Sequence, residues 1–321
     1  MSTGRAAQRA GRRTPGPGGA AGRPNVWAAR SPCDPRCVAA DAARVPAARA
    51  LRRTAAFGAV VAGAFADSGR LGDPEVLRAR AQDVLDALGV TLDRRGGALS
   101  APGPTGTLIV ANHISWLDIV ALLAVEPVTM LAKRQVGQWP LVGTLVRRAG
   151  TLFIDRDSLR ELPATVARIA GLLRAGRSVM VFPQGVTWCQ GTGGPFRRAT
   201  FQAALDAGAP VRPVTLDYFQ RRRPTTVAAF VGDDDFAGSL RRVVRAADLS
   251  VRVTVHGAVL PVPGTDDRRG LAARARAAVA GAPGFATPVP RAHGPGAHGP
   301  GARETGAFGP AFPAVVPPAG R

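Results

Sequence analysis

Short apolar runs alternate with helical patterns along the middle of this 321-residue chain. Runs of roughly four to eight apolar or β-branched residues between turn residues indicate buried strands. We predict strands at residues 107–110, 128–131, 151–155, 178–182, 211–218, 226–231 and 251–255. Helical patterns separate most of them, so the alternation predicts an α/β fold with a mixed, largely buried sheet flanked by helices.

Two of the helical patterns carry signals for their ends. One is predicted to run from Asp73, a suitable N-cap, to Gly89, a suitable stop. Another is predicted to begin at Ser158, with Glu161 completing a capping box, and to end at Gly176. Further helices are expected near residues 138–148, 198–208 and 236–247.

Composition divides the chain into four parts. Residues 1–45 form a basic tail and residues 263–321 a helix remnant followed by a Pro/Gly-rich tail, and we expect both tails to be disordered. The main domain is expected at 71–262. Between tail and domain, residues 46–70 contain an apolar run that is too short to span a bilayer. This run is equally compatible with a core helix and with a segment that dips into one leaflet of a membrane.

A formal net charge of +20 favours an anionic partner, which could be nucleic acid, an acidic membrane surface or a phosphorylated substrate. A single tyrosine and the lack of a recognisable module argue against nucleic acid, so we expect none as a partner. The three cysteines make neither a disulfide framework nor a four-ligand spacing, so we expect no metal site.

The segment ANHISWLD, residues 111–118, places His113 and Asp118 five positions apart directly after an apolar run. If a helix begins at Ser115, His113 lies in the preceding loop and its ring can turn back toward Asp118. A carboxylate that holds one imidazole nitrogen makes the other a better base. The alternative is that Ser115 and Asp118 form a capping box, in which Asp118 only accepts backbone N–H groups. Spacing alone favours this alternative.

Four motifs occur in order between residues 107 and 218: N-H-x-S-x-x-D at 112–118, Lys133 with WPLVG and GTLFIDR at 139–143 and 150–156, FPQGVT at 182–187, and PVRPV at 210–214. Together they resemble the lysophospholipid acyltransferases, the family that includes 1-acylglycerol-3-phosphate acyltransferase. Lys133 is the only lysine of the chain, and it stands where the family has its lysine.

The resemblance implies that a fatty acyl group passes from a thioester to the hydroxyl of a lysophospholipid. His113 would be the general base with Asp118 as its partner, while Lys133 and Arg156 would hold the acceptor phosphate. The donor would be acyl-CoA or acyl carrier protein, with no other cofactor and no metal. The expected location is the cytoplasmic face of the cell membrane, peripheral or monotopic, on an anionic surface.

The third motif departs from the family pattern F-P-E-G-T-R, because Gln184 replaces the glutamate and Thr187 the arginine. Gln184 and Gly185 are expected in the substrate site. A glutamine keeps the shape of glutamate but accepts hydrogen bonds more weakly and adds a donor. The acceptor is then a different lyso-lipid, such as a lyso-aminolipid, or the protein is a catalytically impaired lipid-binding relative. A thioesterase that uses water in place of the lipid hydroxyl is a further alternative.

Overall fold

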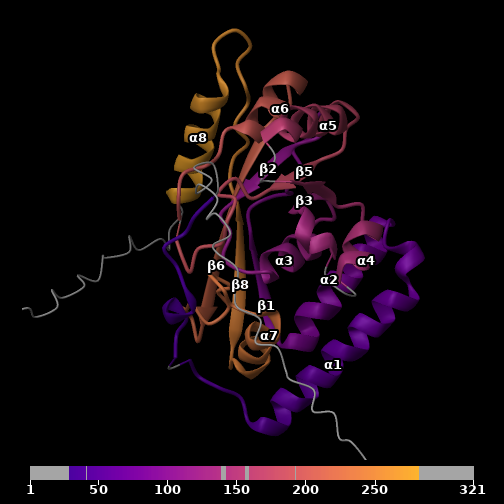
Figure 1. The fold of residues 1–321 in the computed structure, drawn as a ribbon, viewed down its shortest axis with the longest axis vertical. Helices are drawn as coiled ribbons and strands as arrows, with labels where there is room; N and C mark the ends of the chain where they lie inside the picture. The colour runs from indigo at the N-terminus through magenta and orange to yellow at the C-terminus, as the bar shows by residue number, and fades with distance from the viewer. Residues whose placement is uncertain (1–28, 41, 139–141, 156–158, 192, 282–321) are drawn as a thin grey trace, which may run out of the picture. The chain divides into compact units, whose positions relative to one another are not determined.

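The computed structural model describes residues 29–281 apart from 41, 139–141, 156–158 and 192. Its centre is a mixed sheet with the strand order β1-β8-β6-β2-β5-β3-β4, and β7 pairs with β6 (Figure 1). The strands are β1 Val90–Arg95, β2 Leu108–Ala111, β3 Thr129–Lys133, β4 Leu152–Ile154, β5 Val179–Val181, β6 Val211–Gln220, β7 Arg223–Pro224 and β8 Leu249–Val255. The mixed α/β architecture predicted from the sequence is confirmed.

Strand direction determines where loops can meet. Strands β6, β2, β5, β3 and β4 are parallel to one another, whereas β8 runs antiparallel to β6 and parallel to β1. The carboxyl ends of β2, β5 and β3 therefore meet at one edge of the sheet. In open α/β sheets, binding and catalytic loops gather at such an edge.

Helices cover both faces of the sheet. They are α1 Ala47–Ala66, α2 Pro74–Leu88, α3 Leu117–Val125, α4 Val142–Arg148, α5 Leu162–Arg174, α6 Ala199–Ala207, α7 Phe236–Arg245 and α8 Arg268–Ala280, with short 3-10 turns η1 Pro35–Cys37, η2 Ser68–Arg70, η3 Arg134–Gln138 and η4 Leu159–Glu161. Buried side chains of α2, α3 and α7 form one core layer, and those of α5, α6 and α8 form the other.

Strand β2 shows why the sheet is buried on both faces. Leu108 and Val110 pack into the layer of α5, α6 and α8, while Ile109 and Ala111 pack into the layer of α2, α3 and α7. Successive side chains of a strand point to opposite faces, so a strand covered on both faces reads as a continuous apolar run. The loop that carries His113 begins directly after this strand, at Asn112.

One predicted strand does not form, and the short strands β1 and β7 were not predicted. Residues 226–231 form turns in place of the predicted strand, with the Ala229 N–H bonded to the Thr226 carbonyl at 2.9 Å. Strand β1 was not predicted because it lies at the edge of the sheet and has the half-polar sequence VTLDRR. Its pairing with β8 includes an ion pair between Asp93 and Arg252 at 2.8 Å.

The helix predictions are confirmed in α2, where the Asp73 carboxylate caps the Glu75 N–H at 2.9 Å and Gly89 is left-handed at φ +68°. The predicted start at Ser158 lies outside the described residues. Helix α5 begins at Leu162, later than predicted, with Glu161 as its N-cap, and the capping box predicted with Ser158 also lies outside the described residues. Helix α3 likewise begins two residues after the predicted Ser115.

The domain is larger at both ends than the sequence predicted. Helix α8 buries Leu271 and Val279 in the core, so the domain does not end at 262. At the other end, the Ala43 N–H bonds to the Gln220 side chain at 3.1 Å, which orders part of the segment that was expected to be a disordered tail. The rest of that tail, like most of the C-terminal one, lies outside the described residues.

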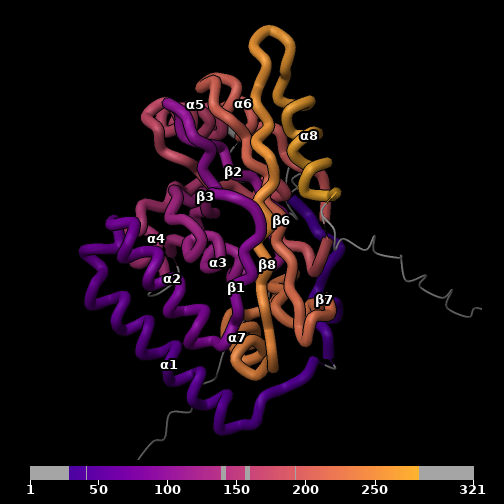
Figure 2. The backbone as a smooth tube through the Cα atoms, turned by 180° about the vertical axis from the view of Figure 1, so that it is seen from behind, coloured from indigo at the N-terminus to yellow at the C-terminus, as the bar shows by residue number. Residues whose placement is uncertain are grey.

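Helix α1 lies alongside α2 on the outside of the domain, as both views show (Figures 1 and 2). Only Ala50 and Ala64 of its side chains are buried, and Leu51 is 71% exposed. This exposure contradicts the interpretation of residues 55–66 as a core helix. Among the described residues, no helix combines the length and the apolar content that a bilayer crossing requires.

Candidate active site

The loop after β2 is fixed at its start by Asn112. The side-chain amide of Asn112 donates to the Leu216 carbonyl and its oxygen accepts from the Leu216 N–H, both at 2.8 Å. These two bonds continue the pairing of β2 with β6 beyond the end of the strand. The buried Asn112 thus sets the position from which His113 leaves the sheet.

His113 and Asp118 are brought together by the turn before α3. The Asp118 Oδ2 lies 2.7 Å from the His113 Nδ1, and the same oxygen accepts the N–H groups of Ile114 and Ser115 at 2.7 and 2.9 Å. The two alternatives left open by the spacing are therefore not exclusive. One carboxylate caps the turn and holds the imidazole.

Sequence reasoning missed a third member of this network, Tyr218 on β6. Its hydroxyl donates to the Asp118 Oδ1 at 2.7 Å, and the residue is 3% exposed. Burial, together with the charge of Asp118, raises the pKa of Tyr218 well above its usual value, so the phenol stays protonated as a donor. That the chain has no other tyrosine was the one available signal.

The bonds to Asp118 determine which imidazole nitrogen carries a proton. An ionised carboxylate only accepts hydrogen bonds, so the His113 Nδ1 must donate and the Nε2 keeps its lone pair. Among the described residues, no hydrogen bond occupies that Nε2. Asp118 is fully buried, whereas the His113 side chain is 17% exposed and stacks on Phe182, with ring centroids 3.9 Å apart. The site therefore presents a base to the surface from a rigid support.

The loop after β5 supports His113 from the other side. The Gln184 Oε1 accepts the His113 backbone N–H at 2.8 Å, and the Trp188 N–H donates to the His113 carbonyl at 2.8 Å. Gln184 is 3% exposed. Gly185 follows at φ +76°, where a side chain would be strained. The structure thus places Gln184 as a support of the His113 backbone.

The predicted phosphate-binding residues are only partly described. Lys133 ends β3, which pairs with β5, so it lies at the same sheet edge as the loops of His113 and Gln184 and is half-buried. Arg156 lies outside the described residues. The structure therefore brings His113, Asp118 and Gln184 into direct contact and places Lys133 two strands away from β2.

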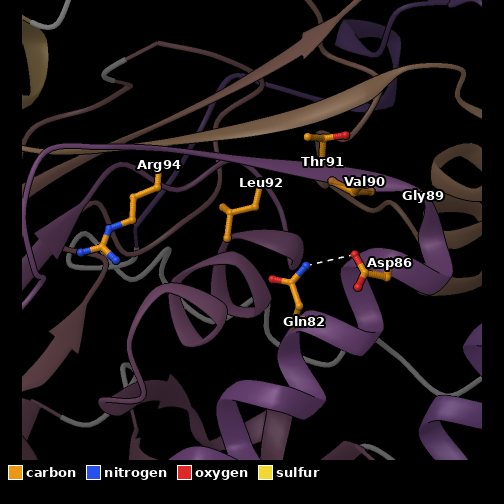
Figure 3. A pocket seen from close by; sticks show the side chains of 7 residues that line it. All are labelled: Gln82, Asp86, Gly89, Val90, Thr91, Leu92 and Arg94. Carbon is orange, nitrogen blue, oxygen red and sulfur yellow. Dashed lines mark hydrogen bonds between the residues drawn. The ribbon is translucent and has the colours of Figure 1, made fainter.

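A pocket of about 480 Å³ lies elsewhere, between the end of α2 and β1 (Figure 3). Gln82 and Asp86, bonded at 3.0 Å, form one side of it, and Arg94 lies at the other end. None of its lining residues belongs to the loops after β2 or β5. This pocket is therefore separate from the candidate active site at His113.

The fold and this network define a protein with a carboxylate-oriented histidine base at the carboxyl edge of an α/β sheet. A family model described as Acyltransferase matches residues 98–217, the segment that contains all of these loops. This match contains the four motifs that resemble the lysophospholipid acyltransferases, and so agrees with the resemblance that the sequence indicated.

Two curated relatives illustrate the range of the family. The chain is 37% identical to a 1-acyl-sn-glycerol-3-phosphate acyltransferase of Neisseria meningitidis, over 53% of this chain and 66% of the relative. It is 39% identical to a lyso-ornithine lipid O-acyltransferase of Pseudomonas aeruginosa, over 54% of this chain and 66% of that relative. The match thus spans just under two thirds of each relative's length.

A solved structure shares the fold. The crystal structure of the 1-acyl-sn-glycerophosphate acyltransferase PlsC from Thermotoga maritima matches with a TM-score of 0.50 and 20% identity, over 72% of this chain and 93% of that one.

Proposed function

We propose that this protein is an O-acyltransferase that moves a fatty acyl group from a thioester to the hydroxyl of a lysophospholipid in lipid biosynthesis. The observation that carries the proposal is the 2.7 Å bond between His113 Nδ1 and Asp118 Oδ2, within the segment that matches the acyltransferase model. Both kinds of curated relative named above acylate a lyso-lipid.

The proposed reaction uses His113 as a proton carrier. The acceptor hydroxyl gives its proton to the His113 Nε2 while its oxygen forms a bond to the thioester carbonyl carbon. The carbon–sulfur bond then breaks, and the departing thiolate takes the proton back from Nε2. Asp118 stabilises the imidazolium that exists between these two events, and its four donors hold it in place.

Transfer of the acyl group straight from the thioester to the acceptor, without an acyl-enzyme, fits the chemistry of Cys189. Cys189 is the cysteine that follows the loop of Gln184, and burial together with the neighbouring Cys33 raises its pKa. A thiol of raised pKa is a poor nucleophile, because the thiolate is the reactive form. An acyl-enzyme on Cys189 is therefore not part of the proposal.

The acceptor we propose first is a 1-acylglycerol-3-phosphate, whose phosphate Lys133 and Arg156 would bind as a point charge and a two-pronged donor. The second candidate acceptor is a lyso-aminolipid. It is favoured by the replacement of the motif's arginine by Thr187, and by the similarity to lyso-ornithine lipid acyltransferases. Acyl-CoA and acyl carrier protein are both candidate donors.

We also propose that α1 holds the enzyme on the cytoplasmic face of an anionic membrane. Leu51, Ala55 and Ala59 are exposed and lie four residues apart, which places them on one face of the helix. Arg53 takes no part in this contact, because it donates to the Val244 and Ala246 carbonyls at the end of α7, at 3.2 and 2.8 Å. The membrane surface would instead meet the apolar face and the other basic residues of the domain.

The test of the activity compares the parent with His113→Ala and with His256→Ala as a matched control. His256 bonds to Thr215 at 2.8 Å and lies outside the Asp118 network. Purified proteins are assayed with lysophosphatidic acid or lyso-ornithine lipid, and with acyl-CoA or acyl carrier protein thioester. We expect His113→Ala to lose on the order of 10² to 10⁴ in rate and the control to keep most of it. Full activity in His113→Ala would refute the base assignment.

The membrane contact is tested separately by flotation with vesicles that contain anionic phospholipid. A variant with both Leu51→Glu and Ala59→Glu should no longer float with the vesicles, because the two substitutions put charge on the apolar face of α1. Leu260→Glu is the control, since Leu260 is 66% exposed but lies after β8. Unchanged flotation of the α1 variant would refute the anchor without touching the catalytic proposal.

A further inference from the structure

The three cysteines of the chain converge in space. The sulfur atoms of Cys33, Cys37 and Cys189 all lie within 4.8 Å of one another, and those of Cys33 and Cys189 are 3.4 Å apart. All three are free thiols and half-buried. The sequence predicted no such cluster, because Cys189 is 156 positions from Cys33 and only the fold brings it to the other two.

The two N-terminal cysteines are presented by a short structured turn. Asp34 caps η1 by accepting the Arg36 N–H at 2.8 Å, and the Cys37 N–H bonds to the Asp34 carbonyl at 2.9 Å. This turn brings the Cys33 and Cys37 side chains to the same side. Two cysteines with two to four residues between them are the usual first half of a structural zinc site.

Cys189 approaches this turn from the active-site loop. Its backbone N–H donates to the Cys33 sulfur at 3.4 Å. A backbone N–H directed at a sulfur stabilises negative charge on that sulfur, as in the outer shell of metal–thiolate sites. The geometry around Cys33 therefore suits a thiolate better than a thiol.

We propose that Cys33, Cys37 and Cys189 bind one zinc ion as a three-thiolate site, with water in the fourth position. Tetrahedral zinc holds sulfur at about 2.3 Å, which places neighbouring sulfurs a little under 4 Å apart. The three sulfurs need only small movements to reach that arrangement. Binding breaks three S–H bonds and forms three Zn–S bonds, so three protons leave for solvent when all three thiols start protonated.

A zinc ion accounts for the cluster better than a disulfide. A disulfide would join two sulfurs and leave the third without a role, whereas a metal uses all three. A metal ion displaces the thiol proton directly and supplies the positive charge that the buried thiolates need.

The site would tie the N-terminal segment to the active-site loop. A Cβ at Gly185 would lie 3.0 Å from the Ala29 Cβ, so this segment already packs on the loop that carries Gln184. Gln184 in turn accepts the His113 N–H. Zinc would therefore hold the loop that supports His113.

The experiment measures metal directly and does not depend on activity. The full chain is purified under reducing conditions without chelator, and its zinc content and X-ray absorption are measured. We expect about one zinc per chain with three sulfurs near 2.3 Å, and three thiols protected from a thiol reagent until a chelator is added. After chelation, cobalt(II) should give the charge-transfer bands of thiolate coordination.

The variants are Cys37→Ser and Cys189→Ser, with Asp34→Asn as a matched control. Asp34 lies between the two N-terminal cysteines, but its carboxylate is bound by Arg36 at 2.6 Å, so it should not be a ligand. We expect Asp34→Asn to keep the zinc and each cysteine variant to bind it at least 10-fold more weakly. Should a cysteine variant not fold, chelation and cobalt reconstitution of the parent still decide the question.

The proposal would be overturned if the parent protein contained no more zinc than a variant that carries Cys33→Ser, Cys37→Ser and Cys189→Ser together. A purified protein that resists metal and contains a disulfide between Cys33 and Cys189 would also overturn it.

Discussion

Tyr218 donates its hydroxyl to the Asp118 Oδ1 at 2.7 Å from a position 100 residues further along the chain. The other oxygen of the same carboxylate holds His113. Strand β6 thus supplies a donor to the candidate active-site loop that the sequence motif itself does not contain. The buried carboxylate is satisfied on both oxygens, which fixes its orientation toward the imidazole.

We expect Tyr218→Phe to lower kcat about 10-fold with little change in KM, because Asp118 loses one donor and orients His113 less firmly. The substitution keeps the ring and leaves a buried acceptor short of a partner, at a cost of about 1–3 kcal/mol. Steady-state kinetics and thermal unfolding measure the two effects.

The control for Tyr218→Phe is Ser239→Ala. It removes the buried hydroxyl that accepts from the Trp116 Nε1 at 3.1 Å, on the other side of the turn. A similar loss of stability with normal kcat is expected there. Equal losses of kcat in both variants would mean that Tyr218 acts only through general stability.

Asp118→Asn should lose both activity and stability. Oδ2 accepts from His113, Ile114 and Ser115, and an asparagine must place its NH₂ against either these donors or the Tyr218 hydroxyl. The buried donors then lack an acceptor, and the His113 tautomer is no longer fixed. Rate and melting temperature are measured on the same preparation. Loss of stability with an unchanged rate would leave Asp118 as a cap alone.

A half-buried carboxylate, Asp217, lies on β6 outside the candidate active site. Its pKa is raised to about 6 by burial, which the charge of Arg252 only partly offsets. Arg252 is its register partner on β8, but that guanidinium is bonded to Asp93 at 2.8 Å and lies over the Phe219 ring. The charge of Arg252 near Asp217 is therefore already paired with the Asp93 carboxylate.

This gives a pH-dependent prediction for Asp217→Asn. The folded-state pKa lies above the unfolded value, so the protonated form favours folding at low pH and this contribution is lost as pH rises through about 6. Asparagine should thus stabilise the protein by about 1–3 kcal/mol at pH 8 and by little at pH 4. Denaturant unfolding at both pH values measures the difference.

Asp93→Asn provides a control of opposite sign. Burial of Asp93 acts to raise its pKa, but the bonds from Arg252 and Arg95 outweigh it and the pKa is lowered. A lowered pKa contributes stability above the unfolded value that is lost as pH falls, so Asp93→Asn should destabilise most at neutral pH. A gain at pH 8 in both variants would show that net charge, not the local environment, governs the effect.

The sequence predicted the parts of the fold that local patterns encode. Strand β2 is apolar on both faces and helix α2 carries its own caps, so both were found. Strand β1 and Tyr218 were missed because their roles depend on partners far along the chain, Arg252 and Asp118. The same holds for the cysteine cluster. His113 and Asp118 could be paired from the sequence because they lie only five positions apart.

At Gln184 the chain departs from the family pattern, and there the side chain supports the backbone of His113. Gln184 is 3% exposed, and its oxygen is bonded to the His113 N–H. The adjacent Gly193 leaves no room for a side chain, because a Cβ there would lie 2.3 Å from the Gln184 Nε2. Three residues on, where the family pattern has arginine, the Thr187 hydroxyl bonds to the Phe230 carbonyl at 2.5 Å. Both changes remove charge from the same loop after β5.

We therefore expect Gln184→Glu to lower the melting temperature at neutral pH and to do so less as pH falls, since burial raises the pKa of a carboxyl and protonation removes the charge. The His113 N–H keeps an acceptor, so kcat should fall only a fewfold. The ratio of kcat/KM for lysophosphatidic acid to that for lyso-ornithine lipid should not change. Thr187→Val, which removes the bond to Phe230 without adding charge, is the control and should show no such pH dependence. A shift of the acceptor ratio in Gln184→Glu would instead place position 184 in contact with the acceptor.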